Sequence, residues 1–279
     1  MRDLARHPEL LSINTATVRE RWRLDEAIEG IARAGIRGIA PWRDQVAAIG
    51  LERAARMIRD AGLTVTGHCR GGMFPASDAA QRRRIAEDNR RAVDEAAALG
   101  AQCLVLVVGG LPEGSRDLPG ARRQVKDGIA ELLPYARDAG VPLAIEPLHP
   151  MYAAERSCVN TLGQANDLCA ELGSGTGVAV DVYHVWWDPM IEAEIARAGA
   201  AGRLLAFHAC DWLVPTRDML LDRGMMGDGV ADIRRLRGLA EAAGYDGLIE
   251  VEIFSAEDWW RRPPEEVLAV CAERFATAC

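Results

Sequence analysis

Three acidic residues and one histidine stand at equivalent positions along this chain, each at the end of a short apolar run. They are Glu146, Asp181, His208 and Glu252. Comparable runs recur every ~25 to 35 residues, a spacing typical of strands that alternate with helices. In a closed parallel barrel, the C-terminal ends of the strands converge on one mouth, so these four side chains can share a single ion. The pattern therefore predicts a metal site.

Eight apolar runs and eight intervening helical patterns account for most of the chain. We predict strands over 11–13, 36–41, 63–68, 103–108, 142–147, 177–181, 204–208 and 248–253. We predict helices over 24–34, 45–61, 78–99, 121–139, 161–172, 189–198, 233–243 and 264–275. Four helical patterns end in a glycine, at Gly35, Gly62, Gly100 and Gly140, and glycine readily adopts the left-handed conformation that follows a helix.

This repeat favours a (β/α)8 TIM barrel, in the α/β class. A doubly wound sheet is the alternative, but such a sheet usually carries a Gly-rich phosphate loop after its first strand, and residues 11–15 contain no glycine. The 279 residues show no linker or shift of composition, so we expect one domain spanning 1–279.

Composition and charge restrict the class of protein. The chain lacks a signal-peptide pattern and any apolar run of ~18 residues, so we expect a cytoplasmic protein that does not bind membranes. The net charge of -8 argues against a nucleic-acid partner. Seven scattered cysteines without metal-ligand spacing are expected to be reduced, buried thiols.

Two segments are longer than ordinary connections. Residues 209–230 lack clear periodicity over about 20 residues, where compact domains usually use ~4 to 6. Residues 109–120 are rich in glycine and proline. Both follow predicted strands at the end where barrel chemistry occurs, and the first is a candidate lid or binding loop.

At these residues the chain resembles the xylose isomerase-like TIM-barrel superfamily, in particular its sugar isomerase and epimerase group. That group includes tagatose 3-epimerases, hydroxypyruvate isomerases and inosose dehydratases. Asp181-Val-Tyr-His184 is similar to the D-x-x-H at the sixth strand, and Gly227-Asp-Gly229 is similar to a G-x-G segment before the last barrel helix. The resemblance covers nearly the whole chain.

The resemblance implies one divalent ion held by Glu146, Asp181, His208 and Glu252, with Glu146 and Glu252 also acting as catalytic acid and base. Three carboxylates and an imidazole suit Mn2+, our expectation, with Mg2+, Co2+ or Zn2+ as alternatives. Residues two apart on a strand face the same side, so Glu250 also points inward. We choose Glu252 as the metal ligand because it lies nearer the mouth. We expect Glu250 to be a buried acid that hydrogen-bonds one of the metal-ligating side chains.

Five further residues are candidate substrate contacts. His184 lies just beyond Asp181 and His68 ends the third predicted strand, while His149 and Trp186 follow the fifth and sixth. An arginine that the resemblance implies shortly after the seventh-strand histidine is replaced by Val214, and we expect Arg217 to substitute for it.

The leading hypothesis is a metal-dependent isomerase or epimerase. It would act on a ketose, a keto-acid or a related polyol by proton transfer through an enediolate. The alternative is a metal-dependent dehydratase, a lyase of the inosose type, which shares the first proton abstraction. An abasic-site endonuclease needs a cluster of two or three metals with several histidine ligands, whereas this acidic chain has only five histidines. A barrel used only for binding would lack some of the four ligands, and all four are present. A small carbohydrate or polyol is the expected partner, and a homo-oligomer is compatible with the sequence.

Overall fold

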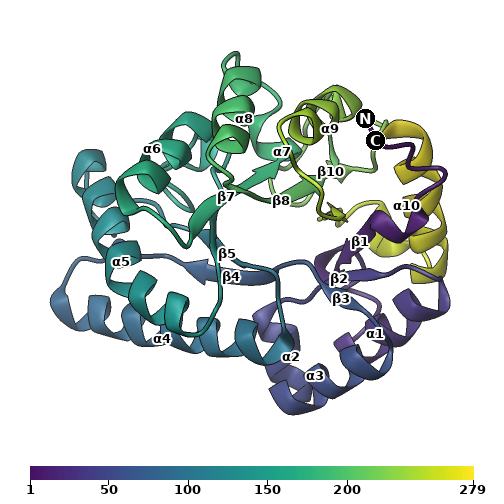
Figure 1. Ribbon diagram of the computed structural model, residues 1–279, viewed down its shortest axis with the longest axis horizontal. Helices are drawn as coiled ribbons and strands as arrows, with labels where there is room; N and C mark the ends of the chain where they lie inside the picture. Colours follow the sequence, from purple (N-terminus) through teal and green to yellow (C-terminus); the bar gives the residue numbers. More distant parts are fainter.

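A computed structural model describes all 279 residues and shows a nearly closed barrel of parallel strands surrounded by helices (Figure 1). Its strand segments are β1 (Leu11–Asn14), β2 (Gly38–Ala40), β3 (Thr64–Val65), β4 (His68–Gly72), β5 (Leu104–Val107), β6 (Leu143–Ile145), β7 (Thr176–Asp181), β8 (Leu204–Ala209) and β11 (Ile249–Val251). The expected TIM-barrel class is confirmed. The two termini lie next to each other beside α9 and α10.

The sheet runs in the order β3-β2-β1-β11-β8-β7-β6-β5-β4. Segments β3 and β4 together occupy the position of the third barrel strand, because β3 pairs with β2 while β4 pairs with β5. A parallel bridge from Trp42 to Cys69 joins the two edges at the mouth. The prediction that this strand ends at His68 was wrong, since a register shift between Cys69 and Gly71 lets pairing continue to Gly72.

The helices agree with the predicted pattern except in two places. They are α1 (Leu24–Arg33), α2 (Arg43–Ile49), α3 (Leu51–Asp60), α4 (Ala79–Leu99), α5 (Leu118–Asp138), α6 (Leu162–Leu172), α7 (Val182–Val185), α8 (Ile191–Ala200), α9 (Ile233–Ala242) and α10 (Pro264–Ala278). The single helix predicted over 45–61 is two helices, divided at Gly50, which has a φ of 89°. The short helix α7 was not predicted.

Local sequence explains several helix boundaries. The side chains of Asp78, Thr161 and Asp232 accept hydrogen bonds from backbone N–H groups three residues on, which satisfies the free donors of α4, α6 and α9. The four glycines predicted to end helices all have positive φ angles between 66° and 74°. The loop over 209–230 contains a small antiparallel pair, β9 (Asp211–Trp212) and β10 (Arg223–Gly224).

The interior of the barrel is lined by small side chains. Cys69, Cys103, Val105, Ala144, Ala179 and Ala206 form a compact inner core, while the larger aliphatic residues pack between strands and helices. Small inner residues leave room for buried polar groups nearer the mouth. All seven cysteines are buried and free, as expected. None of the helices is both long enough and apolar enough to span a bilayer.

Gly38 provides a test of this tight inner packing. A Cβ at Gly38 would lie 2.4 Å from Ser12 Cβ and 2.7 Å from Ser12 Cα, where neither atom can move freely. We expect Gly38→Ala to lower the free energy of unfolding by ~1–3 kcal/mol, measured by urea denaturation. Gly163→Ala is the control, because its Cβ would meet only the flexible end of Glu194 at 3.3 Å. Equal stability of both variants would contradict the packing argument.

Candidate metal and catalytic site

The four residues singled out at strand ends lie together at the mouth of the barrel. Glu146 and Glu252 follow β6 and β11 directly, Asp181 is the last residue of β7, and His208 lies in β8. Each side chain is nearly or fully withdrawn from solvent, with exposed fractions of 5%, 5%, 0% and 0% in that order. Parallel pairing places Asp181 beside His208. The register of the sheet therefore brings together groups that are far apart in the sequence.

The imidazole of His208 is held between two carboxylates. Its Nδ1 lies 2.8 Å from Glu146 Oε1, and its Nε2 lies 3.6 Å from Glu250 Oε1. Burial disfavours the charged imidazolium, but Glu250 and Glu146 outweigh it and raise the pKa of His208 well above its usual value. A cation bound at Nδ1 would take the place of the proton there.

Glu250 and Glu252 both point into the barrel, at two depths. Asn14 donates to both, over 2.8 Å to Glu250 Oε1 and 3.0 Å to Glu252 Oε1. The hydroxyl of Thr66 donates to the other oxygen of Glu250 over 2.7 Å. Only Glu252 lines the open cavity above the cluster. Glu250 is therefore placed to orient the His208 ring, and Glu252 to meet a ligand.

Arg223, from β10, lies inside the acidic cluster. Its Nη1 is 2.9 Å from Glu252 Oε2 and 3.3 Å from Asp181 Oδ2. The guanidinium carbon also lies 4.4 Å from the ring centre of Tyr183 and 5.0 Å from that of Phe254. A planar cation between two carboxylates and two aromatic faces is held in one orientation.

The cluster carries more negative charge than the arginine balances. Burial raises the pKa of Asp181 to about 6 and that of Glu252 to about 7, although Arg223 opposes both shifts. Ligand atoms of Asp181, His208 and Glu252 lie within 4.8 Å of one another, and so do those of Glu146, Asp181 and His184. Buried carboxylates and an oriented imidazole at this spacing fit a divalent cation.

The cavity above the cluster is small and partly aromatic. Its volume is about 20 Å³, room for about one water, and its walls include Trp42, Tyr152 and Phe254. Leu220, from the long loop between β9 and β10, also lines it. The carbonyl of Met219 accepts hydrogen bonds of 2.7 Å from two tyrosine hydroxyls, those of Tyr152 and Tyr183, which hold the loop in place.

Of the five predicted substrate contacts, His184 alone lines the cavity. Its Nδ1 accepts from the backbone N–H of His149 over 3.2 Å, and its Nε2 lies 3.3 Å from Arg223 Nη2. Burial and then the charge of Arg223 hold the pKa of His184 well below its usual value, so the ring is neutral. A neutral imidazole at this position can form a hydrogen bond with a substrate hydroxyl.

The other four lie outside the cavity. His68 faces the helical layer, with Nδ1 3.0 Å from the Pro41 carbonyl and Nε2 3.1 Å from Glu95. His149 stacks on Trp212 at 4.7 Å, and Trp186 packs against the same ring at 5.9 Å. Arg217 pairs with Asp222 within its own loop.

Sequence reasoning did not place two residues in the cluster, Arg223 and Asn14. The distance along the chain from His208 favoured Arg217, but the loop after β8 turns back through β9 and β10. Arg223 lies four residues before Gly227, and its nearness to that glycine was the available signal. Asn14 closes the first strand just as the acidic residues close theirs, and this signal was available.

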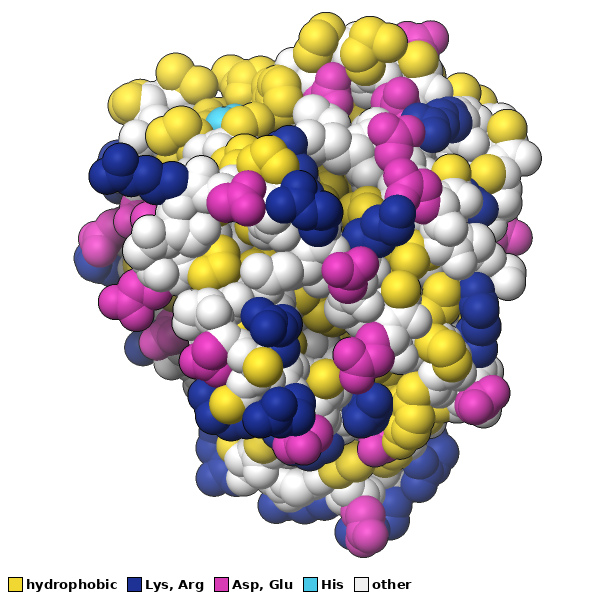
Figure 2. Space-filling view, turned by 90° about the vertical axis from the view of Figure 1, so that its left-hand side faces the viewer, with side chains coloured by type: hydrophobic (Ala, Val, Ile, Leu, Met, Phe, Trp, Pro, Cys, Tyr) yellow, Lys and Arg dark blue, Asp and Glu magenta, His cyan; other side chains and the backbone are white.

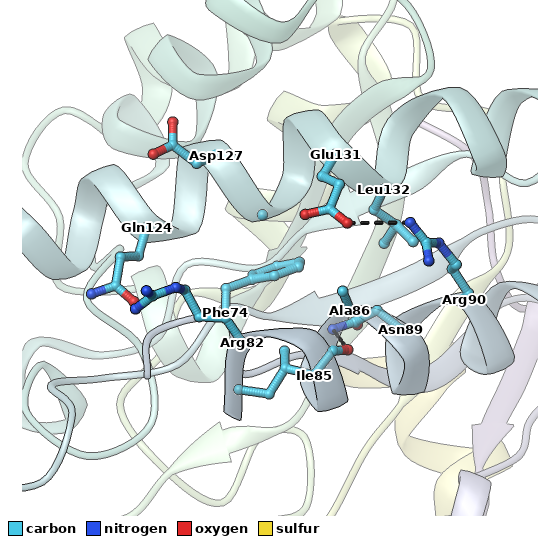
Figure 3. Close-up of a pocket in the computed structure, with 11 residues that line it drawn as sticks. Phe74, Arg82, Ile85, Ala86, Asn89, Arg90, Gln124, Asp127, Glu131 and Leu132 are labelled. Carbon is cyan, nitrogen blue, oxygen red and sulfur yellow. Dashed lines mark hydrogen bonds and ion pairs between the residues drawn. The ribbon is translucent and has the colours of Figure 1, made fainter. Parts of the chain in front are cut away.

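A larger hollow of about 350 Å³ lies outside the barrel, between α4 and α5 (Figure 3). Phe74 and Ile85 form part of its wall, and Arg90 pairs with Glu131 at its edge. It contains no cluster of catalytic or metal-ligating groups. Figure 2 shows a side of the molecule on which positive and negative side chains are interspersed without a continuous patch of either sign. We therefore place the chemistry at the barrel mouth.

Comparison with known proteins agrees with this geometry. The family model described as xylose isomerase-like TIM barrel matches residues 28–271. The chain belongs to this family. Within the xylose isomerase-like family, a solved structure of a protein from Sinorhizobium meliloti is 63% identical, covers 98% of this chain and 99% of its own, and has a TM-score of 0.96.

Two more distant structures share the fold. The IolI protein with a bound zinc atom is 20% identical with a TM-score of 0.78, and 95% of each chain is covered. A D-psicose 3-epimerase solved in the presence of D-fructose is 17% identical with a TM-score of 0.77, covering 95% of this chain and 96% of its own. No curated protein matches the chain. The predicted family is thus confirmed.

Proposed function

We propose that this xylose isomerase-like protein is a metal-dependent isomerase or epimerase of a small ketose, keto-acid or polyol. The observation that carries the proposal is a pair of carboxylates, Glu146 and Glu252, that line one cavity from strand ends separated by β7 and β8. Two carboxylates facing a common substrate can remove a carbon-bound proton and return it. Together with Asp181 and His208 they would hold one divalent ion, with Mn2+ our first expectation.

The side chains around the pair have separate tasks. Asn14 and Arg223 fix the two oxygens of Glu252, so its position is set before substrate arrives. Neutral His184 would hydrogen-bond a substrate oxygen. When bound, the ion would stabilise the negative charge that develops on an enediolate. Trp42 and Phe254 offer apolar faces to the C–H side of a sugar.

A screen of substrates tests the proposal. Ketoses, inososes and keto-acids would be incubated with the Mn2+-supplemented protein in D2O, with NMR detection of exchange at the carbon next to the carbonyl. An isomer of the substrate that carries deuterium at that carbon supports the isomerase, and a product that has lost one water supports the dehydratase alternative. Hydrolysis of a phosphodiester without any exchange would refute both.

We predict that the purified protein binds about one divalent ion per chain, because the two groups of mutually close ligand atoms share Asp181. Elemental analysis of the purified protein and anomalous scattering from a Mn2+-soaked crystal measure the amount and the place. Asp181→Asn should lose the ion, while Asp188→Asn, a buried acid outside the cluster, should keep it. An ion held by other residues would contradict the assignment.

A further inference from the structure

Two arginines at the barrel mouth are not used by the proposed chemistry. Arg70, in β4, and Arg156, in the loop after β6, both line the cavity that contains Glu146 and Glu252. Both are half-buried. Neither guanidinium forms an ion pair or donates a hydrogen bond within the chain, and Arg156 rests over the ring of Tyr152 at 5.6 Å.

The backbone fixes both arginines in place. Arg70 follows Cys69, which is bridged to Trp42 across the two edges of the sheet. The carbonyl of Arg156 accepts from the backbone N–H of Gly109 over 2.9 Å. The next residue, Gly110, lies so close to this loop that a Cβ would be 2.3 Å from the Ala154 carbonyl oxygen. The two side chains are therefore presented from rigid backbone, as a ready-made binding site requires.

The other charged groups of the cavity wall do not pair with Arg70 or Arg156. These groups are Glu146, Glu252 and Arg223, and Arg223 is already paired with Glu252 and Asp181. Burial and the positive charge of Arg156 hold the pKa of Arg70 below its usual value. Arg70 and Arg156 are thus two positive charges of this wall that have no ion-pair partner.

The position of Arg70 also fits a ligand that extends outward. It lines the small cavity and, on its other side, an outer hollow of about 740 Å³. In that hollow Arg43 is paired with Asp88 and Glu95, and Arg19 with Asp44. Arg70 is therefore an unpaired cation at the boundary between the chemical site and open space.

We propose that Arg70 and Arg156 bind an oxyanion group of the substrate, a carboxylate or a phosphate, while its carbonyl end lies at Glu146 and Glu252. This inference rests on the proposed function and narrows it: the substrate is an acidic sugar derivative or a keto-acid rather than a neutral sugar. Guanidinium groups suit both oxyanions, because their N–H donors match two oxygens of either one.

Binding of small anions tests the proposal without knowledge of the substrate. Inorganic phosphate and acetate would be titrated separately into the purified protein by calorimetry at constant ionic strength. We expect at least one of them to bind, and Arg70→Gln with Arg156→Gln together to weaken that Kd at least ~tenfold. Arg197→Gln, on α8 and paired with Asp167 on the surface, is the control and should bind like the wild type. Phosphate alone indicates a sugar phosphate, and acetate alone indicates a sugar acid or keto-acid.

Two results would overturn the anion site. One is the absence of binding by either anion up to about 50 mM, and the other is equal binding by the wild type and the double variant. Arg70→Lys is the control for misfolding of the glutamine variants, because it keeps the positive charge and should retain part of the anion affinity. A structural role for Arg70 predicts that Arg70→Gln lowers the melting temperature, whereas removal of an unpaired half-buried charge should not.

The two proposals can fail separately. Anion binding that depends on Arg70 and Arg156, without proton exchange on any acidic or neutral substrate, would refute the isomerase and leave the anion site standing. Proton exchange on a neutral ketose, without anion binding, would refute the anion site and leave the isomerase standing.

Discussion

Replacement of Glu252 by glutamine should lower kcat by at least ~10²–10⁴-fold, because a general acid or base of the reaction is removed. Glutamine nearly preserves the shape of the side chain. Its oxygen can still accept from Arg223, but its amide nitrogen then faces the Asn14 Nδ2 donor, so a modest loss of stability accompanies the loss of turnover. Steady-state kinetics at saturating metal, with a melting curve of the same sample, separates the two effects.

Glu250→Gln is the matched control, two residues earlier on the same strand. Thr66 can rotate its hydroxyl to accept from the new amide, so the fold should tolerate the change. What is lost is the carboxylate 3.6 Å from His208 Nε2. We expect metal affinity to fall ~10–100-fold while kcat at saturating metal is largely kept. The opposite result, an inactive Glu250→Gln with an active Glu252→Gln, would show that the inner glutamate does the chemistry.

Glu146→Gln should abolish incorporation of deuterium from D2O into substrate, even when the ion remains bound. Glu146 lines the cavity and contacts His208 at 2.8 Å, so it is placed both to bind metal and to move a proton. NMR of the substrate follows exchange, and elemental analysis of the same sample reports the metal. Because glutamine keeps one oxygen, we expect metal binding to weaken but to be restored by excess ion.

Removal of the ion with EDTA tests whether exchange and turnover depend on the metal. Exchange and turnover should stop together in the wild type and return together on addition of Mn2+. Exchange that persists in EDTA, or exchange by Glu146→Gln at the wild-type rate, would contradict the assigned role of the Glu146 and Glu252 pair. A primary isotope effect with substrate deuterated next to the carbonyl would identify proton abstraction as rate-limiting.

Much of the barrel could be predicted because its signals are local. Apolar runs of strand length, helices of matching periodicity and glycines at helix ends repeat throughout the chain, and each depends on residues within a few positions. The grouping of Glu146, Asp181, His208 and Glu252 followed from one further rule, that parallel strands of a barrel end at a common mouth. The depth of Glu250 relative to Glu252 followed from the two-residue repeat of a strand.

Details of the third strand and of the second helix escaped the same reasoning. His68 stands at the end of an apolar run, yet its ring faces Glu95 in the helical layer rather than the cavity. The strand continues past it to Gly72 through a register shift, which an apolar pattern does not record. Gly50 divides a continuous amphipathic pattern into α2 and α3 because of its backbone conformation.

By itself, therefore, the sequence determined that Glu146, Asp181, His208 and Glu252 meet at the mouth, because each closes a parallel strand of one barrel. Only the tertiary structure decided which loop residues join them. Arg223 reaches the cluster, and Arg217 does not, because β10 pairs with β9 and the two tyrosines hold the Met219 carbonyl. Contacts of this kind link residues tens of positions apart, and no local pattern of residue types encodes them.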